Sequence, residues 1–456
     1  MNTQIFIDRE RELEFLKQQE EQRPSLAVIY GRRRVGKSSL VEKFCRGKKH
    51  LYYTASESNK KEQLNEIYSL ASEKLEDKLI QDLKHSWETL LRYLKDKNLI
   101  LVLDEFPYII NSDPSIPSKI KRIWDEELRD SNIFLILTGS SVSMMEDDVI
   151  SPRSPLYGRR TGQWKLEPFD FTSAQKFFPD YSMEDKIRTY SVLGGIPYFL
   201  EQFDPDEPVM ENISRSILNK GSVLYNEVEF LMREELREPR NYYTTLRSIS
   251  QGNTKFSDIQ NDTGIAKNSL TSYLSILRNL HLIKRRTPIT KKNSKKGRYY
   301  LEDNFFRFWF RYIFPNKSQL ETDKKLLLGK IEDTLDQYVS FIFEDVCREC
   351  VNMDRTGYEV GRWWFREEEI DIVALNEREK KALFAECKWS KNPVDSTLLH
   401  DLKEKAKKVR WNSDNRKERY AIFSRSGFTK EIKEGSDSDL NIHLYDLNDM
   451  KQVFEK

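Results

Sequence analysis

Long apolar runs and clustered cysteines are both missing from this 456-residue sequence. No segment approaches the roughly 18 consecutive apolar residues of a membrane span, and the polar beginning MNTQIFIDRE has no apolar core of the signal-peptide kind. The four cysteines are too few for a disulfide scaffold in so long a chain, and they show no metal-type pairing with the five histidines. We therefore expect a cytoplasmic protein without a membrane partner.

Net charge is also small over the whole chain, at +2, but it is unevenly distributed. Residues 241–312 contain fourteen Lys or Arg and only four Asp or Glu, a local balance of +10. Such an excess suits an acidic partner. Apolar residues make up 38% and charged residues 33%, which is enough for packed cores with a solvated surface. The length favours two to four domains, and three is the number we expect.

Short apolar runs alternate with helical patterns between about residues 25 and 170. The runs LAVIY, LILVLDE and IFLILTGSS begin at residues 26, 99 and 133. This rhythm predicts a parallel sheet covered by crossover helices. A helical region follows, then a compact basic unit, and then a helix that leads into the strands EIDIVAL and ALFAECKW.

A phosphate-binding motif follows the first apolar run directly. The string GRRRVGKSS at residues 31–39 matches GxxxxGK[ST] between a strand and an amphipathic helix, which is the order that a P-loop requires. Its glycines let backbone amides face the phosphates, Lys37 supplies charge to the β and γ oxygens, and Ser38 offers a hydroxyl to Mg²⁺. The predicted ATP ligands in this string are Gly31, Arg32, Arg33, Arg34, Val35, Gly36, Lys37, Ser38 and Ser39.

The run LILVLDE ends in a carboxylate pair that a P-loop enzyme needs. Asp104 is expected to hold Mg²⁺ through water, and Glu105 to polarise the attacking water as the catalytic base. Acidic residues also end many strands without any function, but the P-loop favours the catalytic interpretation.

With these residues, the chain resembles AAA+ type ATPases of the archaeal group related to the STAND regulators. FIDREREL at 6–13 resembles the box that lies along the adenine, with Arg9, Glu10 and Glu12 in place but Asp8 where the family usually has glycine. GIP at 195–197 resembles the motif by which the helical lid touches the base, which implies a contact from Pro197. Without the resemblance, GIP is an ordinary turn.

The same resemblance implies a sensor and an arginine finger. The strand LILTGSS resembles the sensor strand between the P-loop and Walker B strands, so Thr138 or Ser140 is expected to sense the γ-phosphate. Small residues that simply end a strand are the alternative. LYGRR precedes the expected strand WKLEPF, and Arg159 or Arg160 is expected to stabilise transition-state charge across a subunit interface of a homo-oligomer. Surface arginines are an equally good interpretation.

The basic unit at 241–312 has the pattern of a winged helix that binds DNA. TKFSDIQNDTGIAKNSLTSYLSILRNL supplies a helix, a glycine-containing turn and a recognition helix, followed by expected wing strands TPIT and RYYLE. Asn268, Ser269, Thr271 and Ser272 begin the recognition helix, and the wing carries Lys291, Lys292, Lys295, Lys296 and Arg298 for phosphate contact. A purely structural or autoinhibitory module is the alternative.

The last two strands predict a second, metal-dependent site. A hairpin centred on NEREKK makes the numbers of facing residues sum to 757, which sets Asp371 opposite Glu386 and Glu369 opposite Lys388 on one face. Two carboxylates with a nearby lysine suit a divalent ion and an activated water for phosphodiester hydrolysis.

This arrangement resembles the PD-(D/E)XK nuclease core. The resemblance implies that Asp371 and Glu386 bind Mg²⁺ or Mn²⁺, that Lys388 orients the nucleophile, and that Glu344 is an additional metal ligand. The sequence has EID where the family has PD, and the ExK triplet recurs at Glu431 and Lys433. A solvated hairpin with cross-strand ion pairs is the alternative.

We therefore predict an α/β fold in four segments. They are a P-loop parallel-sheet ATPase core at 1–170, a helical lid at 171–238, a winged helix at 239–325 and a restriction-endonuclease-like α/β domain at 326–456. The predicted function is ATP binding and hydrolysis by a protein that acts on DNA, with a nuclease-like site gated by nucleotide state. The alternatives are a STAND-like regulatory switch, or a transcription regulator that binds DNA or protein without cleavage.

Overall fold

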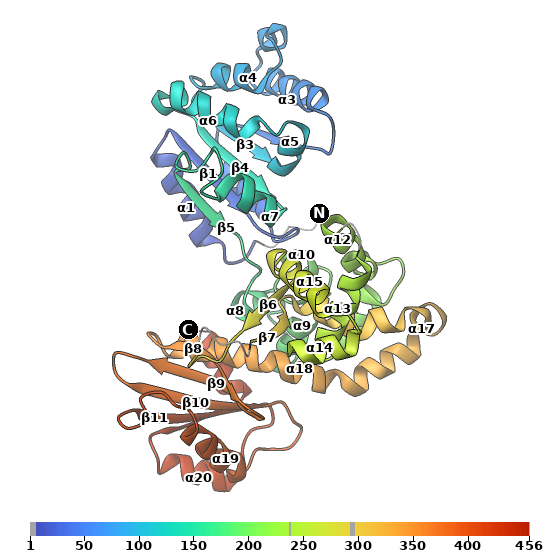
Figure 1. The fold of residues 1–456 in the computed structure, drawn as a ribbon, viewed down its shortest axis with the longest axis vertical. Coiled ribbons are helices and arrows are strands. Elements are labelled where there is room, and N and C mark those ends of the chain that lie inside the picture. Colours follow the sequence, from blue (N-terminus) through green and yellow to red (C-terminus); the bar gives the residue numbers. More distant parts are fainter. Residues whose placement is uncertain (1–5, 237–238, 292–296, 456) are drawn as a thin grey trace. The chain divides into compact units, whose positions relative to one another are not determined.

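The computed structural model describes residues 6–236, 239–291 and 297–455, which form two compact units (Figure 1). Unit 1 comprises the chain up to Pro168 together with Ile196–Tyr198. Unit 2 comprises Phe169–Gly195 and the chain from Phe199 onward. None of the helices in the described ranges is both long and apolar enough to cross a membrane.

Unit 1 is built on a five-stranded, wholly parallel sheet, which confirms the expected α/β core. The strand order is β2-β3-β4-β1-β5, so the predicted sensor strand β4 does lie between the P-loop strand β1 and the Walker B strand β3. The strands are β1 (Ser25–Tyr30), β2 (His50–Thr54), β3 (Ile100–Asp104), β4 (Phe134–Gly139) and β5 (Gly162–Lys165).

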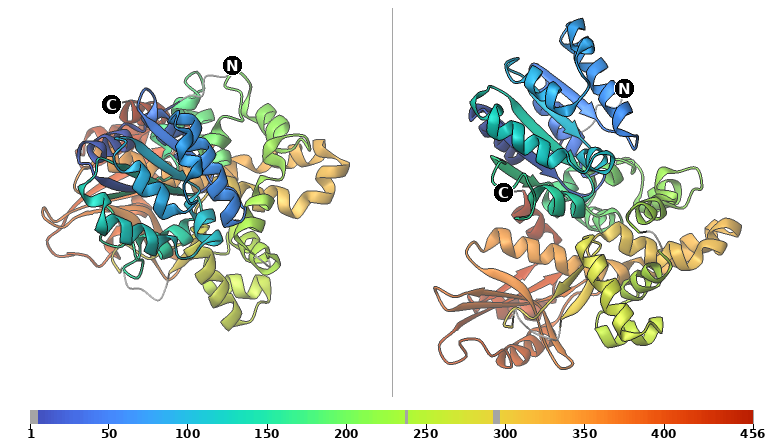
Figure 2. Two further views of the ribbon diagram at one scale, coloured as in Figure 1. Left: turned by 90° about the horizontal axis from the view of Figure 1, so that it is seen from above. Right: turned by 45° about the horizontal axis from the view of Figure 1, so that its top comes forward.

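Helices cover both faces of this sheet, as two further views show (Figure 2). Along β1, Leu26 and Val28 belong to one core cluster, and Ala27 and Ile29 belong to the other. A strand buried on both faces reads as a continuous apolar run, which is why the sequence revealed β1, β3 and β4. The helices are α1 (Glu10–Glu21), α2 (Lys37–Cys45), α3 (Lys60–Lys74), α4 (Trp87–Leu94), α5 (Phe106–Ser112), α6 (Ile116–Glu126) and α7 (Val142–Met144).

Two details of unit 1 differ from the sequence-based expectation. Strand β2 was not anticipated, because its residues HLYYT are only alternately buried. The strand expected at WKLEPF is β5, which begins earlier at Gly162 and ends at Lys165.

Unit 2 begins with short helices and continues into a helix-rich region with a small sheet. The first helices are α8 (Phe171–Ala174), α9 (Met183–Leu193), α10 (Pro197–Leu200), α11 (Val209–Asn212) and α12 (Glu227–Glu235); the first two residues of α10 belong to unit 1. The next elements are α13 (Arg240–Ser250), α14 (Phe256–Thr263), α15 (Lys267–Asn279), β6 (Ile283–Arg286), β7 (Arg298–Leu301), α16 (Asn304–Phe308), α17 (Lys317–Thr322) and α18 (Lys324–Asp354).

A second five-stranded sheet, of mixed direction, completes unit 2. Its order is β12-β11-β10-β9-β8; β10, β11 and β12 are mutually parallel, and β9 and β8 are antiparallel to their neighbours. Helix α19 packs on β9, β10 and β11 through Leu402 and Ala406. The elements are β8 (Glu359–Phe365), β9 (Glu368–Asn376), β10 (Lys381–Lys388), α19 (Ser396–Lys407), β11 (Lys417–Ser424), α20 (Lys430–Asp437), β12 (Ile442–Tyr445) and α21 (Leu447–Phe454).

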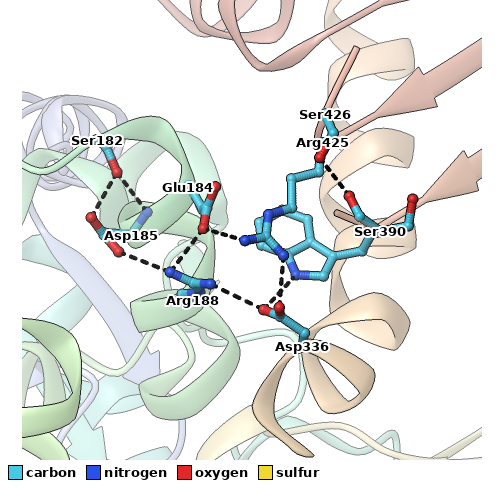
Figure 3. A network of polar contacts seen from close by, with 9 residues as sticks. Ser182, Glu184, Asp185, Arg188, Asp336, Ser390, Arg425 and Ser426 are labelled. Atoms are coloured by element: carbon cyan, nitrogen blue, oxygen red, sulfur yellow. Dashed lines mark hydrogen bonds and ion pairs between the residues drawn. The ribbon is translucent and has the colours of Figure 1, made fainter. Parts of the chain in front are cut away.

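A network of charged groups joins α9, α18 and the ends of strands β10 and β11 (Figure 3). Asp336 on α18 accepts hydrogen bonds from Arg188 of α9 (3.1 Å), Arg425 after β11 (2.7 Å) and the indole of Trp389 after β10 (3.2 Å). Arg425 also donates to Glu184 of α9 (2.7 Å). Burial alone would raise the pKa of Asp336, but these donors outweigh it and lower the pKa to about 2.

This network makes a prediction about acid stability. A carboxyl group whose pKa is depressed by folding stabilises the folded state above its unfolded pKa of about 4, and the stabilisation is lost as pH falls towards 2. Because Asp336 is partly exposed, we expect its contribution to be about 1–2 kcal/mol. Asp336→Asn should therefore lower the free energy of unfolding at pH 6 and make much less difference at pH 3, as measured by calorimetry.

The matched control for this measurement is Asp333→Asn, one turn earlier on the exposed side of α18. It should leave the pH dependence of stability unchanged. An identical pH profile for wild type and Asp336→Asn would contradict the assignment.

Candidate functional site

The loop between β1 and α2 has a backbone that requires glycine at both predicted positions. A Cβ atom on Gly31 would lie 2.2 Å from the carbonyl oxygen of Leu166. Gly36 has a φ of 95°, in the left-handed region, and α2 begins at the next residue, Lys37. The loop therefore leads into a helix N-terminus whose free amides favour a phosphate.

Lys37 is held inside this loop by the loop's own backbone. Its Nζ donates to the carbonyl oxygens of Gly31 (3.0 Å) and Arg32 (3.1 Å), and the residue is 5% exposed. Burial lowers the pKa of Lys37 to about 8, although the carboxylates of Glu105 and Asp104 act in the opposite direction. The ammonium group is thus positioned to exchange carbonyl oxygens for phosphate oxygens.

Three hydroxyl groups converge on the buried carboxylate of Asp104. Its Oδ2 accepts from Ser38 (3.0 Å) and from Tyr52 (2.9 Å), and its Oδ1 accepts from Thr138. Sequence analysis identified Ser38 and Thr138 but missed Tyr52, because β2 was itself not anticipated. A hydroxyl beside a carboxylate is an oxygen donor set that fits Mg²⁺.

Glu105 lies one residue further on, in a strained conformation. Its φ is 53°, which is uncommon for a residue with a side chain. Ser140 fixes its carboxylate through the backbone amide (3.1 Å) and through the hydroxyl (2.6 Å). Of the two expected sensor residues, Thr138 therefore contacts Asp104, and Ser140 contacts Glu105.

The remaining P-loop residues contact aromatic and proline side chains of unit 1. Arg33 donates to the hydroxyl of Tyr108 (2.8 Å), and the guanidinium of Arg34 lies 4.1 Å from the ring centre of Tyr198. A Cβ atom on Gly36 would lie 4.0 Å from Cγ of Pro197. Pro197 of the GIP segment and the next residue, Tyr198, therefore lie beside the P-loop.

The N-terminal box is tied to the same loop through Arg9. This buried guanidinium donates to the carbonyl oxygens of Val35 (3.3 Å) and Glu167 (2.9 Å) and pairs with Glu12 (3.0 Å). Asp8 has a φ of 44°. This left-handed conformation explains why the family usually has glycine at this position, because glycine adopts it without steric cost. Aspartate is one of the few other residues that tolerate it.

The two candidate arginine fingers are both engaged within unit 1. Arg159 forms an ion pair with Asp125 at 2.8 Å. Arg160 donates to the carbonyl oxygen of Ile150 (2.8 Å) and to Gln163. A role in hydrolysis would require either side chain to leave these partners.

The C-terminal hairpin has the predicted register. Asn376 faces Lys381, and Ile372 faces Ala385, so every observed pair sums to 757. The expected strict alternation fails on the other side of β9, where the pairing with β8 shifts between Gly361 and Trp363. Such a bulge changes which residues share a face. The observed β9–β10 pairs end at Ile372 and Ala385, and beyond them Glu369 forms an ion pair with Arg298 (2.6 Å).

Asp371 and Glu386 do come together. The charge of Asp371 acts on Glu386, and the amide of Cys387 donates to Asp371 Oδ2 (3.0 Å). Burial and the charge of Asp371 raise the pKa of Glu386, whereas Lys405 of α19, which donates to Glu386 Oε1 (2.8 Å), opposes this shift. A buried carboxyl group beside a second carboxylate holds its proton more tightly unless a cation offsets the repulsion.

Two other predicted members of this site are placed differently. Glu344 forms an ion pair with Arg362 of β8, and Lys388 is exposed. In the residues that the structure describes, no group of three His, Cys, Asp or Glu side chains is arranged to hold a metal ion. Glu344 was expected as an additional ligand beside Asp371 and Glu386, and it is not grouped with them. Lys405 is the member that sequence analysis missed.

The basic unit has the expected order of three helices followed by two strands. Asn268, Ser269, Thr271 and Ser272 are all exposed at the start of α15. The first strand is β6, IKRR, and not TPIT, whose residues follow β6. Lys291 is exposed, Arg298 is held by Glu369, and the predicted Lys292, Lys295 and Lys296 lie outside the described residues.

Two family models match this chain. One, described as an ATPase domain predominantly from Archaea, matches residues 6–203. The other describes archaeal and bacterial proteins of unknown function and matches residues 309–408. The first match contains every residue of the P-loop and Asp104 site, and the second contains Asp371, Glu386 and Lys405.

Similar proteins come from archaea. An uncharacterized protein of Methanocaldococcus jannaschii is 39% identical over 98% of this chain and 100% of its own length. An uncharacterized ATP-binding protein of the same organism is 48% identical over 10% of this chain and 78% of its own length. Among solved structures, the Walker-type ATPase of Pyrococcus abyssi aligns with a TM-score of 0.52 and 24% identity over 67% of this chain and 96% of its own.

The contact from Tyr52 to Asp104 makes a prediction about Mg²⁺. A hydrogen bond to a charged group is worth about 1.5–3 kcal/mol, so Tyr52→Phe should leave Asp104 less well oriented and raise the Mg²⁺ concentration required for half-maximal ATP hydrolysis by about tenfold. Tyr53→Phe is the control, because the Tyr53 hydroxyl donates to Glu66 instead. The same Mg²⁺ requirement in both variants would exclude this role for Tyr52.

Proposed function

Since this chain belongs to the family of proteins that carry the ATPase domain found predominantly in Archaea, we propose that it uses ATP to control a metal-dependent, nuclease-like site that acts on DNA. The single observation that carries the ATPase part is the group formed by Lys37, Ser38, Asp104 and Glu105, which follow or end the parallel strands β1 and β3 on either side of β4.

Each of these residues has a separate task in hydrolysis. Lys37 binds the β and γ oxygens of ATP. Ser38 and Asp104 would hold Mg²⁺, which supplies positive charge beside the phosphates. Glu105 accepts the proton of the attacking water, and Ser140 keeps its carboxylate in place. Arg159 or Arg160 stabilises transition-state charge in a neighbouring subunit of a homo-oligomer, once released from its present partners.

The second site consists of Asp371 and Glu386 on adjacent strands. The raised pKa of Glu386 supports a cation site, because a divalent ion would relieve the repulsion between the two carboxylates. Mg²⁺ or Mn²⁺ would supply Lewis-acid chemistry there. Lys388 orients the nucleophile from its exposed position, and Lys405 fixes the Glu386 carboxylate.

DNA is the substrate we propose for this site. The exposed polar start of α15 is suited to contact base edges as the recognition helix of a winged helix. The local excess of positive charge favours the phosphate backbone.

Helix α9 would transmit a change of nucleotide at the P-loop to the site of Asp371 and Glu386. The residues that follow this helix, Ile196–Tyr198, belong to unit 1, where Pro197 and Tyr198 pack on the P-loop. At the other end of α9, Glu184 and Arg188 join the network of Asp336 and Arg425. The amide of Arg425 donates to the carbonyl oxygen of Lys388 (3.0 Å), so a change at the P-loop has a covalent and hydrogen-bonded route to the second site.

A regulatory switch without cleavage is the second candidate. It is favoured by Lys405, whose ammonium group already neutralises Glu386. In this case ATP would change the oligomeric state, and the C-terminal domain would bind DNA or a protein.

ATP hydrolysis tests the first part of the proposal. Lys37→Ala should abolish Mg²⁺-dependent phosphate release and weaken ATP binding. Glu105→Gln should retain ATP binding and lower kcat by about 10²–10⁴-fold, the usual contribution of a general base. Lys43→Ala, on the exposed side of α2, should have no effect. Hydrolysis that survives both active-site changes would exclude this mechanism.

Metal binding and DNA cleavage test the second part. Without nucleotide, Mn²⁺ should bind to the wild type and not to Asp371→Ala or Glu386→Gln, as measured by calorimetry. Lys388→Ala should retain the metal but lose cleavage of branched, linear or single-stranded DNA. The controls are Glu431→Gln and Lys433→Ala, which alter the same ExK triplet on α20.

Adding ATP to these assays separates the two candidate functions. Cleavage that depends on both ATP and Asp371 supports the gated nuclease. Metal binding without cleavage under any nucleotide condition supports the switch. Cleavage that persists in Asp371→Ala and Lys388→Ala would show that the activity comes from another site.

A further inference from the structure

Five cationic side chains gather on one side of the small β6–β7 sheet, and we call this group the basic cradle. Lys284 and Arg286 are alternate residues of β6, so they project from the same face. Tyr300 of β7 lies opposite Lys284. The ring of Tyr300 has the guanidinium groups of Arg286 and Arg362 at 5.2 Å and 5.8 Å from its centre. The members of the cradle are Lys284, Arg286, Arg307, Arg348 and Arg362.

Helix α18 supplies both a cation and the balancing carboxylates. Asp345 binds Arg286 at 3.0 Å and also binds Arg348, so these two guanidinium groups share one carboxylate. The neighbouring Glu344 binds Arg362. Arg307 donates to a backbone carbonyl oxygen, that of Leu301, at 3.0 Å.

The carboxylates do not balance this charge. Besides Asp345 and Glu344, the exposed Glu302 is the acidic group that acts on Lys284, so these three carboxylates face five basic side chains. Lys284 has no ion-pair partner within the described ranges. Burial and the charges of Arg286, Arg307 and Arg348 lower the pKa of Lys284 to about 7, although Glu302 acts in the opposite direction.

Unused donors point to what is missing from the cradle. The Nε atoms of Arg348 and Arg362 are buried and have no hydrogen-bond acceptor among the described residues, and the Arg348 side chain is only 12% exposed. A buried donor without an acceptor is costly. Crowded cations add mutual repulsion to this cost.

We propose that the basic cradle is a binding site for a phosphate group. A phosphate offers several acceptor oxygens and carries one negative charge as a backbone diester or up to about two as a monoester. It would offset part of the positive charge and supply acceptors for the free guanidinium donors. The ammonium of Lys284 contacts the phosphate directly, because it is the cation without a carboxylate of its own.

The position of the cradle favours a nucleic-acid backbone as the source of this phosphate. Arg348 follows Cys347, whose thiol contacts that of Cys387 between Glu386 and Lys388. The charge of Arg348 also interacts with Asp371. A polymer with successive phosphates could thus occupy the cradle and the carboxylate site together. Phosphate binding itself depends neither on metal nor on cleavage.

The test is calorimetric titration of inorganic phosphate into the full chain in metal-free buffer. All proteins carry Lys37→Ala, so that binding at the P-loop is reduced and is the same in every sample. Adding Lys284→Met should weaken phosphate binding by about tenfold or more, since a charge-assisted contact is lost. Lys284→Arg should retain most of the affinity, and Lys430→Met, on the exposed surface of α20, should retain all of it.

The same substitution also provides a control for correct folding. Lys284→Met removes a partly desolvated charge that has no ion pair, so its thermal midpoint without phosphate should equal or exceed that of the parent. Equal phosphate affinity in Lys284→Met and its parent, or no phosphate binding by the parent at millimolar concentration, would falsify the proposal.

Short single-stranded DNA then identifies the source of the phosphate. If the cradle holds the nucleic-acid backbone, Lys284→Met should weaken DNA binding by a factor similar to its effect on phosphate. If phosphate affinity falls and DNA affinity does not, the cradle serves a free phosphate or a small phosphorylated molecule. Either result is measured without cleavage, so failure of the nuclease proposal and failure of the cradle are distinguishable.

Discussion

The packing of unit 2 depends on the burial of one long helix, α18, against both helices and strands. Its 31 residues carry a continuous apolar stripe, which includes Leu327, Ile331, Val339, Ile342 and Val346. An isolated stripe of this length would be exposed to water, so the surrounding elements must cover it. Polar residues at the edges of the stripe then determine which element covers each turn.

These edge contacts follow one another along the helix. Asp336 accepts hydrogen bonds from α9 and from the residues that follow β10 and β11. Two residues later, the Tyr338 hydroxyl donates to the carbonyl oxygens of Ser191 (2.9 Å) and Asn304 (3.0 Å). Asp345 forms an ion pair with Arg286 of β6. Glu349 accepts hydrogen bonds from the amides of Phe171 (2.9 Å) and Thr172 at the start of α8. One helix thus fixes the register of elements that are distant in sequence.

Sequence alone predicted those features whose physical cause is local. Strands β1, β3 and β4 were evident because both faces are buried, whereas the edge strands β2 and β5 mix polar with apolar residues. The P-loop was evident because its function requires adjacent residues, and the hairpin register because a short turn determines it.

The missed features all depend on contacts between distant segments. Nothing in the lysine-rich sequence of α19 distinguishes Lys405 from its neighbours; only packing of α19 on β10 brings it to Glu386. The pairing of Arg298 with Glu369 likewise depends on how the β6–β7 sheet meets β8 and β9. The shift in the β8–β9 pairing between Gly361 and Trp363 could not be anticipated either.

The two unbalanced charge groups of unit 2 are explained together by one class of ligand. Asp371 and Glu386 repel each other, and Lys405 offsets only one of their two charges, while the crowded cations of the basic cradle repel one another. Each arrangement costs free energy in the isolated chain, and the cost persists only where folding is secured elsewhere. Here α18 secures it, because its apolar stripe and the Asp336 network hold the strands and the β6–β7 sheet in place. A metal ion accompanied by a phosphodiester backbone would supply both kinds of charge, which is why we propose nucleic acid as the ligand of unit 2.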